Sequence, residues 1–173
     1  LDPAHATLTP CGAAEVPGGS QGPRHMKFSS DGKFAYVLNE LSLSIASYSV
    51  NIGNAQLEYI DTQSVFTNGI APEGMSCAEI RIHPSEQWLY ASIRDLAGQG
   101  RDVLSTFQRA VDGSIKLIAN TPAAVYIPRN FNIDPSGKWL IVGGQRSSTL
   151  AIFSIHQDTG ALTLKSADIP FEG

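Results

Sequence analysis

A sequence pattern repeated three times at intervals of about fifty residues constrains the fold more than any other feature of this chain. Each copy has a stretch of alternating apolar residues, a turn rich in Ser, Pro, Asp and Gly, and a second alternating stretch that opens with an aromatic residue. The copies begin at His25, Glu79 and Asn130, and their aromatic residues are Phe34, Trp88 and Trp139. Alternation with period two that is interrupted by turn residues is typical of β-hairpins. A repeat of this length is in the range of the blades of β-propellers.

Two further strands are predicted after each hairpin. The third strands run from Leu43 to Val50, from Val103 to Arg109 and from Leu150 to His156, and the fourth strands begin near Ala55, Ser114 and Ala161. Four strands make one blade, so we predict blades at residues 21–68, 74–121 and 124–171, preceded within residues 1–20 by the outermost strand of another blade. No segment has a sustained apolar period of 3.6 residues. We therefore expect an all-β fold in which residues 1–173 form one partial β-propeller domain of about three and a half blades.

The sequence also predicts that this propeller is incomplete. Propellers usually hold about four to eight blades around a central channel, and each blade buries its faces only against its neighbours. About three and a half blades leave two apolar faces open, and exposed apolar surface of that size indicates an absent partner. We therefore expect a closed ring completed by another polypeptide, by a cleaved half of the same precursor, or by a second copy of this chain.

Charge and hydropathy exclude several kinds of partner. The formal net charge is −4 and the chain has no run of Lys or Arg, so it lacks the long-range attraction that nucleic acids and anionic membranes require. No apolar stretch approaches the roughly 20 residues that cross a bilayer, and the first residues lack the layout of a signal peptide. We expect no nucleic-acid partner, no membrane partner and a cytoplasmic location, with secretion as the alternative.

The sequence predicts neither a metal site nor a cofactor. Cys11 and Cys77 are too few for a disulfide scaffold and lack the close His or Cys neighbours of a zinc site. We expect two half-buried thiols, with one disulfide as the open alternative. No glycine-rich turn leads into a helix, which removes the phosphate-loop interpretation, and no cluster of His, Asp and Glu has metal-ligand spacing.

Candidate site residues are found where the three repeats carry different polar groups at equivalent positions. These positions are the starts of the first strands and the ends of the second strands, and an antiparallel hairpin brings them to one edge of the sheet. In a propeller the first strand lines the channel, so these residues should converge near one mouth of it. They are Arg24, His25, Glu40, Glu79, Arg94, Arg129 and Gln145. Cations, carboxylates and a histidine around an opening can bind an anionic small molecule and move a proton.

Several of these residues also have a purely structural interpretation, and Glu40 at its strand exit could simply be a solvated loop carboxylate. Arg24 and Arg94 could simply pair with Glu40 or Glu79 across the seams between blades, and His25 could simply satisfy a backbone carbonyl. His83 stands at a turn position, where we expect it to be a turn residue. The insertion from Asp95 to Asp102 either shapes the site or is a loop without chemistry.

The residues around these positions resemble those of a known family. The segment Gly22-Pro23-Arg24-His25-Met26 and the segment Tyr36-Val37-Leu38-Asn39-Glu40-Leu41 resemble the central blade of the seven-bladed lactonases of the 6-phosphogluconolactonase type. The segments 78–84 and 128–147 resemble the next two blades of that family, in the same order. The segment Ser92-Ile93-Arg94-Asp95 departs from the Ser-Asn-Arg-Gly form common in the family but keeps its arginine. The resemblance implies that this chain supplies its share of seven blades.

The resemblance also implies an activity. Arg24, Glu40 and Arg94 stand at positions corresponding to site residues of the family, and a further family histidine belongs to blades that precede this chain. The expected reaction is hydrolysis of a sugar-acid lactone. Glu40 or His25 would be the general base, and Arg24 and Arg94 would hold the anionic substrate and stabilise the oxyanion; Glu79, Arg129 and Gln145 are expected to bind substrate. The alternatives are a carboxy-cis,cis-muconate cyclase, which acts on a dicarboxylate, and a propeller that binds partners without catalysis.

Overall fold

The computed structural model describes residues 5, 7–10, 12–67 and 73–171, and every regular element in these ranges is a β-strand. The first sheet contains β1 (Pro23–Phe28), β2 (Phe34–Asn39), β3 (Ser44–Asn51) and β4 (Gln56–Ser64). The second contains β5 (Met75–Ile82), β6 (Trp88–Asp95), β7 (Val103–Arg109) and β8 (Ile115–Pro122). The third contains β9 (Pro128–Ile133), β10 (Trp139–Gly144), β11 (Thr149–Ile155) and β12 (Leu162–Pro170). The predicted all-β fold and the three four-stranded blades are thus confirmed.

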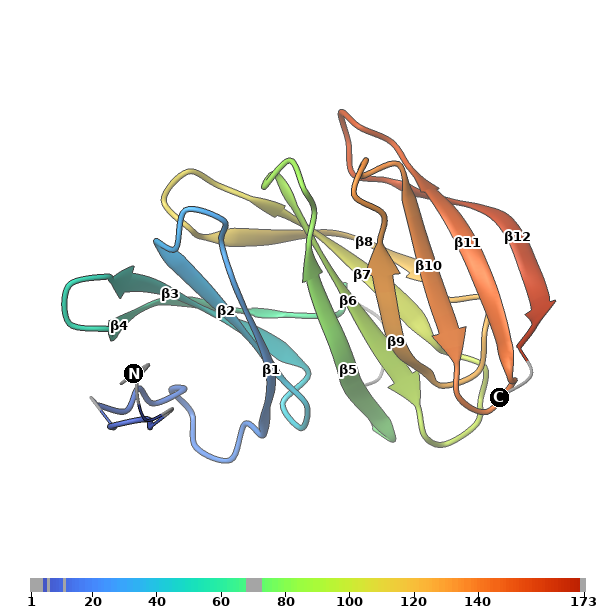
Figure 1. Cartoon of the computed structure of the whole chain (residues 1–173). Helices are drawn as coiled ribbons and strands as arrows, with labels where there is room; N and C mark the ends of the chain where they lie inside the picture. Colours follow the sequence, from blue (N-terminus) through green and yellow to red (C-terminus); the bar gives the residue numbers. More distant parts are fainter. Residues whose placement is uncertain (1–4, 6, 11, 68–72, 172–173) are drawn as a thin grey trace.

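Each sheet is a simple antiparallel meander in which strand order follows chain order. The three sheets stand side by side, and their first strands β1, β5 and β9 are neighbours, while β4 and β12 lie far apart (Figure 1). This is the arrangement of propeller blades around a channel lined by the first strands. The described residues contain no helix with the length and hydropathy needed to cross a bilayer.

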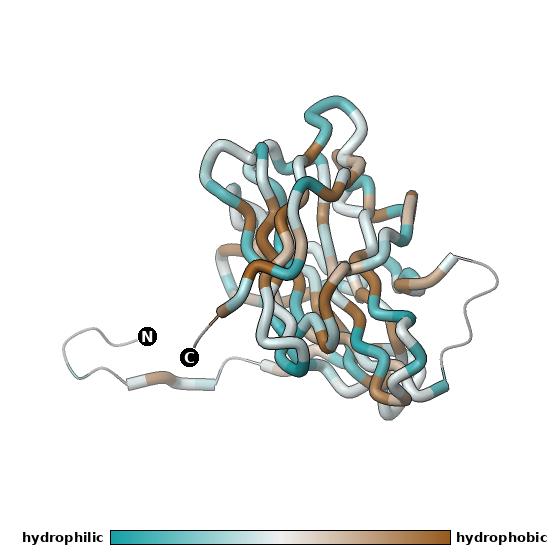
Figure 2. The backbone as a smooth tube through the Cα atoms, turned by 90° about the vertical axis from the view of Figure 1, so that its right-hand side faces the viewer, coloured by the Kyte–Doolittle hydropathy of each residue, from teal (hydrophilic) through white to brown (hydrophobic). Residues whose placement is uncertain are grey.

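Two hydrophobic cores fill the seams between neighbouring sheets. Apolar and polar residues alternate along the strands in the body of the molecule (Figure 2), so each sheet presents apolar side chains to the sheets beside it. The first seam is centred on Leu38, Ile45, Ile80, Ile93 and Phe107. The second is centred on Trp88, Leu104, Phe131, Val142 and Phe153. The second sheet is therefore covered on both faces, as an internal blade of a propeller must be.

The same contact between an aromatic ring and a glycine recurs at both seams. The ring of Phe34 lies so close to Gly113 that a Cβ at Gly113 would be 2.1 Å from it, and Trp88 lies against Gly160 in the same way, at 2.6 Å. Both glycines have positive φ angles in the turn between the third and fourth strands, where a larger residue would be strained as well as crowded. Trp139 occupies the equivalent position of the third sheet, but it is 42% exposed. The third sheet thus presents the aromatic half of a seam that is not completed within the described residues.

The predicted outermost strand of a preceding blade does not form among the described residues of segment 7–16. Thr7 makes an isolated bridge, and residues 8–10 and 12–16 have no strand assignment. A fourth strand needs the third strand of its own blade as a partner, and no such partner is present in the described ranges. Part of the segment instead covers the open face of the first sheet, where Val16 packs near Tyr48 and the Tyr48 hydroxyl donates to the Glu15 carbonyl at 3.1 Å.

Candidate active site at the channel mouth

A β-bulge lies at the same position in the first strand of all three sheets. The register of β1 against β2 shifts between Pro23 and His25, so Arg24 is the extra residue. In β5 the shift falls between Cys77 and Ile80, and in β9 it falls at Arg129. A bulge bends its strand and changes the direction of its side chains. The bulges therefore point the repeat-specific residues into the end of the channel where β1, β5 and β9 begin, which we call the mouth.

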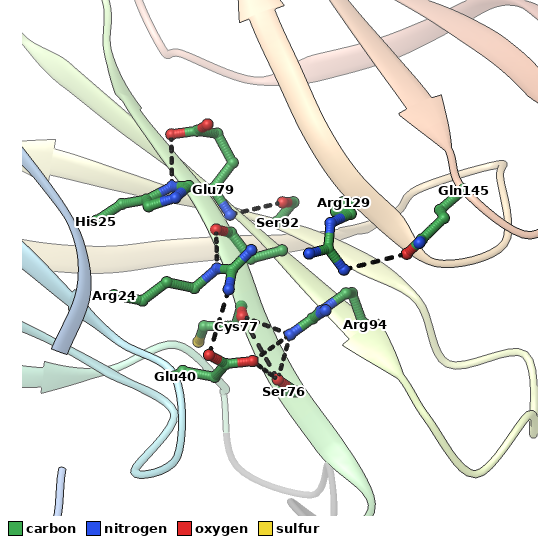
Figure 3. Close-up of polar contacts among 11 residues, drawn as sticks. Arg24, His25, Glu40, Ser76, Cys77, Glu79, Ser92, Arg94, Arg129 and Gln145 are labelled. Atoms are coloured by element: carbon green, nitrogen blue, oxygen red, sulfur yellow. Dashed lines mark hydrogen bonds and ion pairs between the residues drawn. The ribbon is translucent and has the colours of Figure 1, made fainter. Parts of the chain in front are cut away.

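Four side chains from the first two sheets form one polar cluster at the mouth (Figure 3). Arg24 donates through Nε to the Ala78 carbonyl at 2.8 Å and through Nη1 to Glu40 Oε2 at 3.3 Å. Glu40 Oε1 accepts from the Ser76 hydroxyl at 2.9 Å and also pairs with Arg94 Nη2. Arg94 Nη2 in turn contacts Ser76 Oγ at 2.6 Å. Glu40 thus holds the two predicted arginines together across the seam.

The surroundings of Glu40 keep its carboxylate charged. Burial alone would raise the pKa of Glu40, but hydrogen bonds from Ser76 and Arg94 and the charge of Arg24 outweigh it and hold the pKa below its ordinary value. Both carboxylate oxygens are occupied by donors. A carboxylate in this state is a weak proton acceptor, so the geometry favours Glu40 as an anchor for arginines rather than as a general base.

His25 belongs to a second cluster, which is organised around Glu79. Nδ1 of His25 lies 3.2 Å from Glu79 Oε1, and Asn130 donates to Glu79 Oε2 at 2.7 Å. Lys27 and Arg81 form ion pairs with the same carboxylate at 3.6 and 3.5 Å. The side chain of Glu79 is 3% exposed whereas that of His25 is 35% exposed. The ring of His25 is therefore accessible, and the predicted substrate ligand Glu79 is buried behind a set of donors.

A hollow of about 450 Å³ connects the first and third sheets at the mouth. It is lined by Arg24 and His25 from β1 and by Arg129, Asn130, Gln145, Leu150 and Phe171 from the third sheet and its flanks. Arg129 donates to Gln145 Oε1 at 3.3 Å. Four of the seven predicted site residues, Arg24, His25, Arg129 and Gln145, thus border one space. The other three predicted residues do not line this hollow. Glu40 contacts Arg24, Glu79 contacts His25, and Arg94 contacts Glu40.

Several residues of these clusters were not predicted from the sequence. Ser76 joins the Glu40 cluster, while Lys27, Arg81 and Asn130 join the Glu79 cluster. Lys27 and Arg81 occupy the same repeat position, two residues after His25 and Glu79, so the alignment of repeats held a signal for this pair. His83 does lie in a turn, but it is 2% exposed and its Nε2 contacts the Gly137 carbonyl of the next sheet at 2.8 Å, so it also ties two blades together.

The described residues contain no group of three or more His, Cys, Asp and Glu side chains placed to hold a metal ion. Cys77 is a free, buried thiol, and burial raises its pKa to about 12. A thiol with such a pKa stays protonated at neutral pH and is a poor nucleophile. Cys11 lies outside the described residues.

The insertion after β6 is an ordered loop built on Asp95. The carboxylate of Asp95 accepts from the Ala97, Gln99 and Arg101 amides and pairs with the Arg101 guanidinium at 3.0 Å. The hydrogen bond from the Arg101 side chain is the largest of the effects that lower the pKa of Asp95 to about 2. Asp102 accepts from the Asp95 and Ile127 amides, and burial raises its pKa. The loop therefore links the second and third sheets at the mouth.

Replacing Asp95 with asparagine is expected to lower the melting temperature at neutral pH much more than at about pH 2. The folded-state pKa of about 2 lies below the ordinary 3.8, so the stabilisation is present above about pH 4 and is lost as the pH falls towards 2. It amounts to on the order of 2 kcal/mol. Thermal unfolding of both proteins across this pH range measures the difference, and burial, the largest cause of the raised pKa of Asp102, is present in both proteins. A difference that stays constant down to pH 2 would contradict the assignment.

Comparisons with known proteins agree with the fold and with the repeat. The sequence model of the family described as "Lactonase, 7-bladed beta-propeller" matches residues 1–173. The chain is 36% identical over 141 residues to a 6-phosphogluconolactonase of Pectobacterium carotovorum, an alignment that covers 82% of this chain and 41% of the relative. It is 36% identical over 157 residues to a 6-phosphogluconolactonase of Formosa agariphila, covering 90% of this chain and 42% of the relative.

A solved structure gives the same result. The crystal structure of a Bacteroides fragilis protein proposed to be a 6-phosphogluconolactonase superposes with a TM-score of 0.77 at 31% identity, covering 88% of this chain and 40% of that one. The chain thus spans about two fifths of the length of the curated relatives that it matches. From its repeats, its bulged inner strands and a family match over its whole length, the chain belongs to the seven-bladed β-propeller lactonase family.

Proposed function

We propose that the assembled protein hydrolyses the lactone of a sugar acid, of the 6-phosphogluconolactone class. The observation that carries this proposal is that an anchored guanidinium, Arg24, and an accessible imidazole, His25, are consecutive residues bordering the same hollow. Ester hydrolysis requires a base for water and a fixed positive group for the oxyanion, and these two side chains supply them. The names of the relatives with 36% identity support the same substrate class.

In the proposed reaction, His25 acts as the general base. Nε2 of His25 accepts a proton from water, and the resulting hydroxide oxygen bonds to the lactone carbonyl carbon. The tetrahedral intermediate then collapses, the bond between the carbonyl carbon and the ring oxygen breaks, and His25 returns the proton to the leaving alkoxide. The product is the open-chain hydroxy acid. Nε and Nη1 of Arg24 are held by the Ala78 carbonyl and by Glu40, whereas Nη2 has no hydrogen-bond partner among the described residues. Arg24 stabilises the oxyanion through this Nη2.

Arg94 and Glu40 act in this proposal by holding Arg24. The Arg94 side chain is 7% exposed, and its Nη2 is already bound to Glu40, Ser76 and the Cys77 carbonyl. The position of the guanidinium of Arg24 is set by Glu40, which Arg94 fixes in turn. Glu40 and Arg94 thus contribute to catalysis by fixing the guanidinium of Arg24. A donor that is already fixed needs no reorganisation when the oxyanion forms.

Arg129 is proposed to bind the anionic group of the substrate. It lies across the hollow from β1, is exposed, and makes one hydrogen bond, to Gln145, among the described residues. A charged guanidinium with unoccupied donors is suited to a phosphate or a carboxylate. Asn130 and Gln145 border the same side of the hollow and can add neutral hydrogen bonds.

The functional unit is proposed to be a closed ring. The chain spans about two fifths of its relatives, and the outer face of the third sheet leaves Trp139, Ile141 and Leu164 between 42% and 46% exposed. The remaining blades would come from another polypeptide, from a cleaved half of the same precursor or from a second copy. The compartment stays a prediction, with the cytoplasm first and secretion as the alternative.

Turnover in water enriched in ¹⁸O tests this function against its alternatives. The assembled protein is expected to open a phosphorylated sugar lactone faster than the protein-free solution does, and the product carboxylate should carry one ¹⁸O atom. A carboxymuconate cyclase would convert its dicarboxylate without incorporating ¹⁸O, and a binding platform would turn over neither substrate. Comparing the phosphorylated lactone with its unphosphorylated form measures the contribution of the proposed anion site. Absence of any lactone turnover above the background would overturn the proposal.

A further inference from the structure

We propose that Glu79 is a positioning residue that fixes the ring of His25 in the tautomer needed for catalysis, and that it does not touch the substrate. The effect of Glu79 on catalysis rests on the proposed function, but its effect on the tautomer of His25 can be tested without an activity assay. Glu79 was predicted from the sequence to bind substrate. Its burial and its hydrogen bonds assign it a different task.

The carboxylate of Glu79 is surrounded by groups that donate hydrogen bonds. Oε1 accepts from the Ile80 amide at 3.0 Å and lies 3.2 Å from His25 Nδ1 and 3.6 Å from Lys27 Nζ. Oε2 accepts from Asn130 at 2.7 Å and lies 3.5 Å from Arg81 Nη2. With both oxygens engaged and a side chain that is 3% exposed, Glu79 has no atom left for a ligand in the hollow.

This environment determines which nitrogen of His25 carries the proton. A carboxylate only accepts, so the neutral imidazole must place its hydrogen on Nδ1 to bond Glu79. Nε2 then keeps its lone pair, and it has no hydrogen-bond partner among the described residues, although the ring borders the hollow. A base oriented by a third group that bonds its other side is the usual arrangement in hydrolases. Glu79 would thus hold His25 ready to accept a proton from water.

The repeat explains how the chain builds this arrangement. His25, Glu79 and Asn130 occupy the same position in three successive repeats, each at the bulge of its first strand or directly after it. The bulges bring the three equivalent side chains into one hydrogen-bonded row across β1, β5 and β9. Lys27 and Arg81, two residues further along their strands, supply the positive charge that offsets the cost of burying a carboxylate.

Nitrogen-15 NMR of the imidazole ring of His25 in the assembled protein tests the inference directly. The chain has four histidines, so selective ¹⁵N-histidine labelling gives few signals, and His25→Gln assigns the one of interest. At a pH where the ring is neutral, the wild-type protein is expected to show the Nδ1-H tautomer. In Glu79→Gln the signal should move towards the Nε2-H tautomer, because the amide can also donate to Nδ1. A wild-type ring in the Nε2-H form, or a tautomer unaffected by Glu79→Gln, would overturn the proposal.

Arg81→Gln is the matched control for a purely structural role. It removes an ion pair from the same carboxylate without changing the contact between Glu79 and His25, so the tautomer of His25 should stay as in the wild type. If Arg81→Gln shifts the tautomer as much as Glu79→Gln does, the effect belongs to the network as a whole and the assignment fails. Because the wild-type spectrum, once assigned with His25→Gln, is itself decisive, the test does not depend on whether Glu79→Gln or Arg81→Gln folds.

Kinetics supply the second readout. Glu79→Gln is expected to lower kcat by about 10-fold or more, with little change in KM, because a positioning group acts on the base and not on substrate binding. A rise in KM at constant kcat would instead make Glu79 a substrate ligand and would overturn the inference. If the NMR result holds but no lactone is turned over, the proposed function fails while the role of Glu79 towards His25 stands.

Discussion

Replacing Arg24 with alanine is expected to lower kcat/KM for lactone hydrolysis by a factor of about 100 or more, the usual loss when a fixed oxyanion donor is removed. Two of the three guanidinium nitrogens of Arg24 are already held, by the Ala78 carbonyl and by Glu40, so the orientation of this group beside the hollow is fixed. Steady-state kinetics of the assembled protein measure the effect. Arg24→Lys should recover little of the loss, because one ammonium cannot reproduce the two anchoring contacts and the free donor.

Arg146→Ala is the control for Arg24→Ala. Arg146 is an exposed arginine that follows Gln145 at the mouth, and its side chain makes no hydrogen bond or ion pair within the described ranges. Removing it changes the net charge by the same amount, so a general electrostatic effect on an anionic substrate would appear in both variants. Equal losses in the two variants, or near wild-type activity of Arg24→Ala, would remove Arg24 from the mechanism.

Trp88→Ala is expected to destabilise the fold by about 3 to 5 kcal/mol, the range for removing a buried aromatic side chain from a core. Trp88 is 5% exposed and packs against Gly160 in the second seam. Its indole Nε1 has no hydrogen-bond partner among the described residues, so the loss comes from packing alone. Urea unfolding of the purified protein, followed by circular dichroism, measures the change in the free energy of unfolding.

Trp139→Ala is the matched comparison, because Trp139 occupies the same repeat position and is 42% exposed. Within this chain the substitution should cost less than about 1 kcal/mol, as surface substitutions usually do. If another blade covers this face, the same substitution should weaken assembly, which sedimentation at several concentrations detects. Equal loss of stability in the two variants without any effect on assembly would contradict the proposed use of this face.

The strands could be predicted from the sequence because the alternation of apolar residues fixes them locally. The third strand of the second sheet was predicted from Val103 to Arg109, which is where β7 lies, and the other predicted third strands and the predicted starts of the fourth strands agree within one residue. The convergence of Arg24, His25, Arg129 and Gln145 followed from antiparallel pairing and from the position of first strands in a propeller. These inferences need only backbone geometry.

The contacts among the site residues could not be predicted in the same way. The bulges at Arg24 and Glu79 are register shifts of one residue. The alternation of apolar and polar residues on either side of a bulge does not indicate which side chain changes direction. The bonds from Glu79 to His25 and Asn130 join three different repeats, so they depend on how neighbouring sheets are rotated relative to one another. The same holds for His83, whose bond to Gly137 crosses a seam. No strand is assigned among the described residues of segment 7–16, because alternation alone does not supply a pairing partner.

In the proposed function, this chain contributes the catalytic mouth of a ring that hydrolyses lactones. The most direct test is size-exclusion chromatography of the purified protein with a lactonase assay on every fraction. Activity is expected to elute with a species well above the 18.5 kDa of this chain, and His25→Gln should abolish activity in that same peak without shifting its position. Activity that elutes with an 18.5 kDa monomer, or activity that survives His25→Gln, would contradict it.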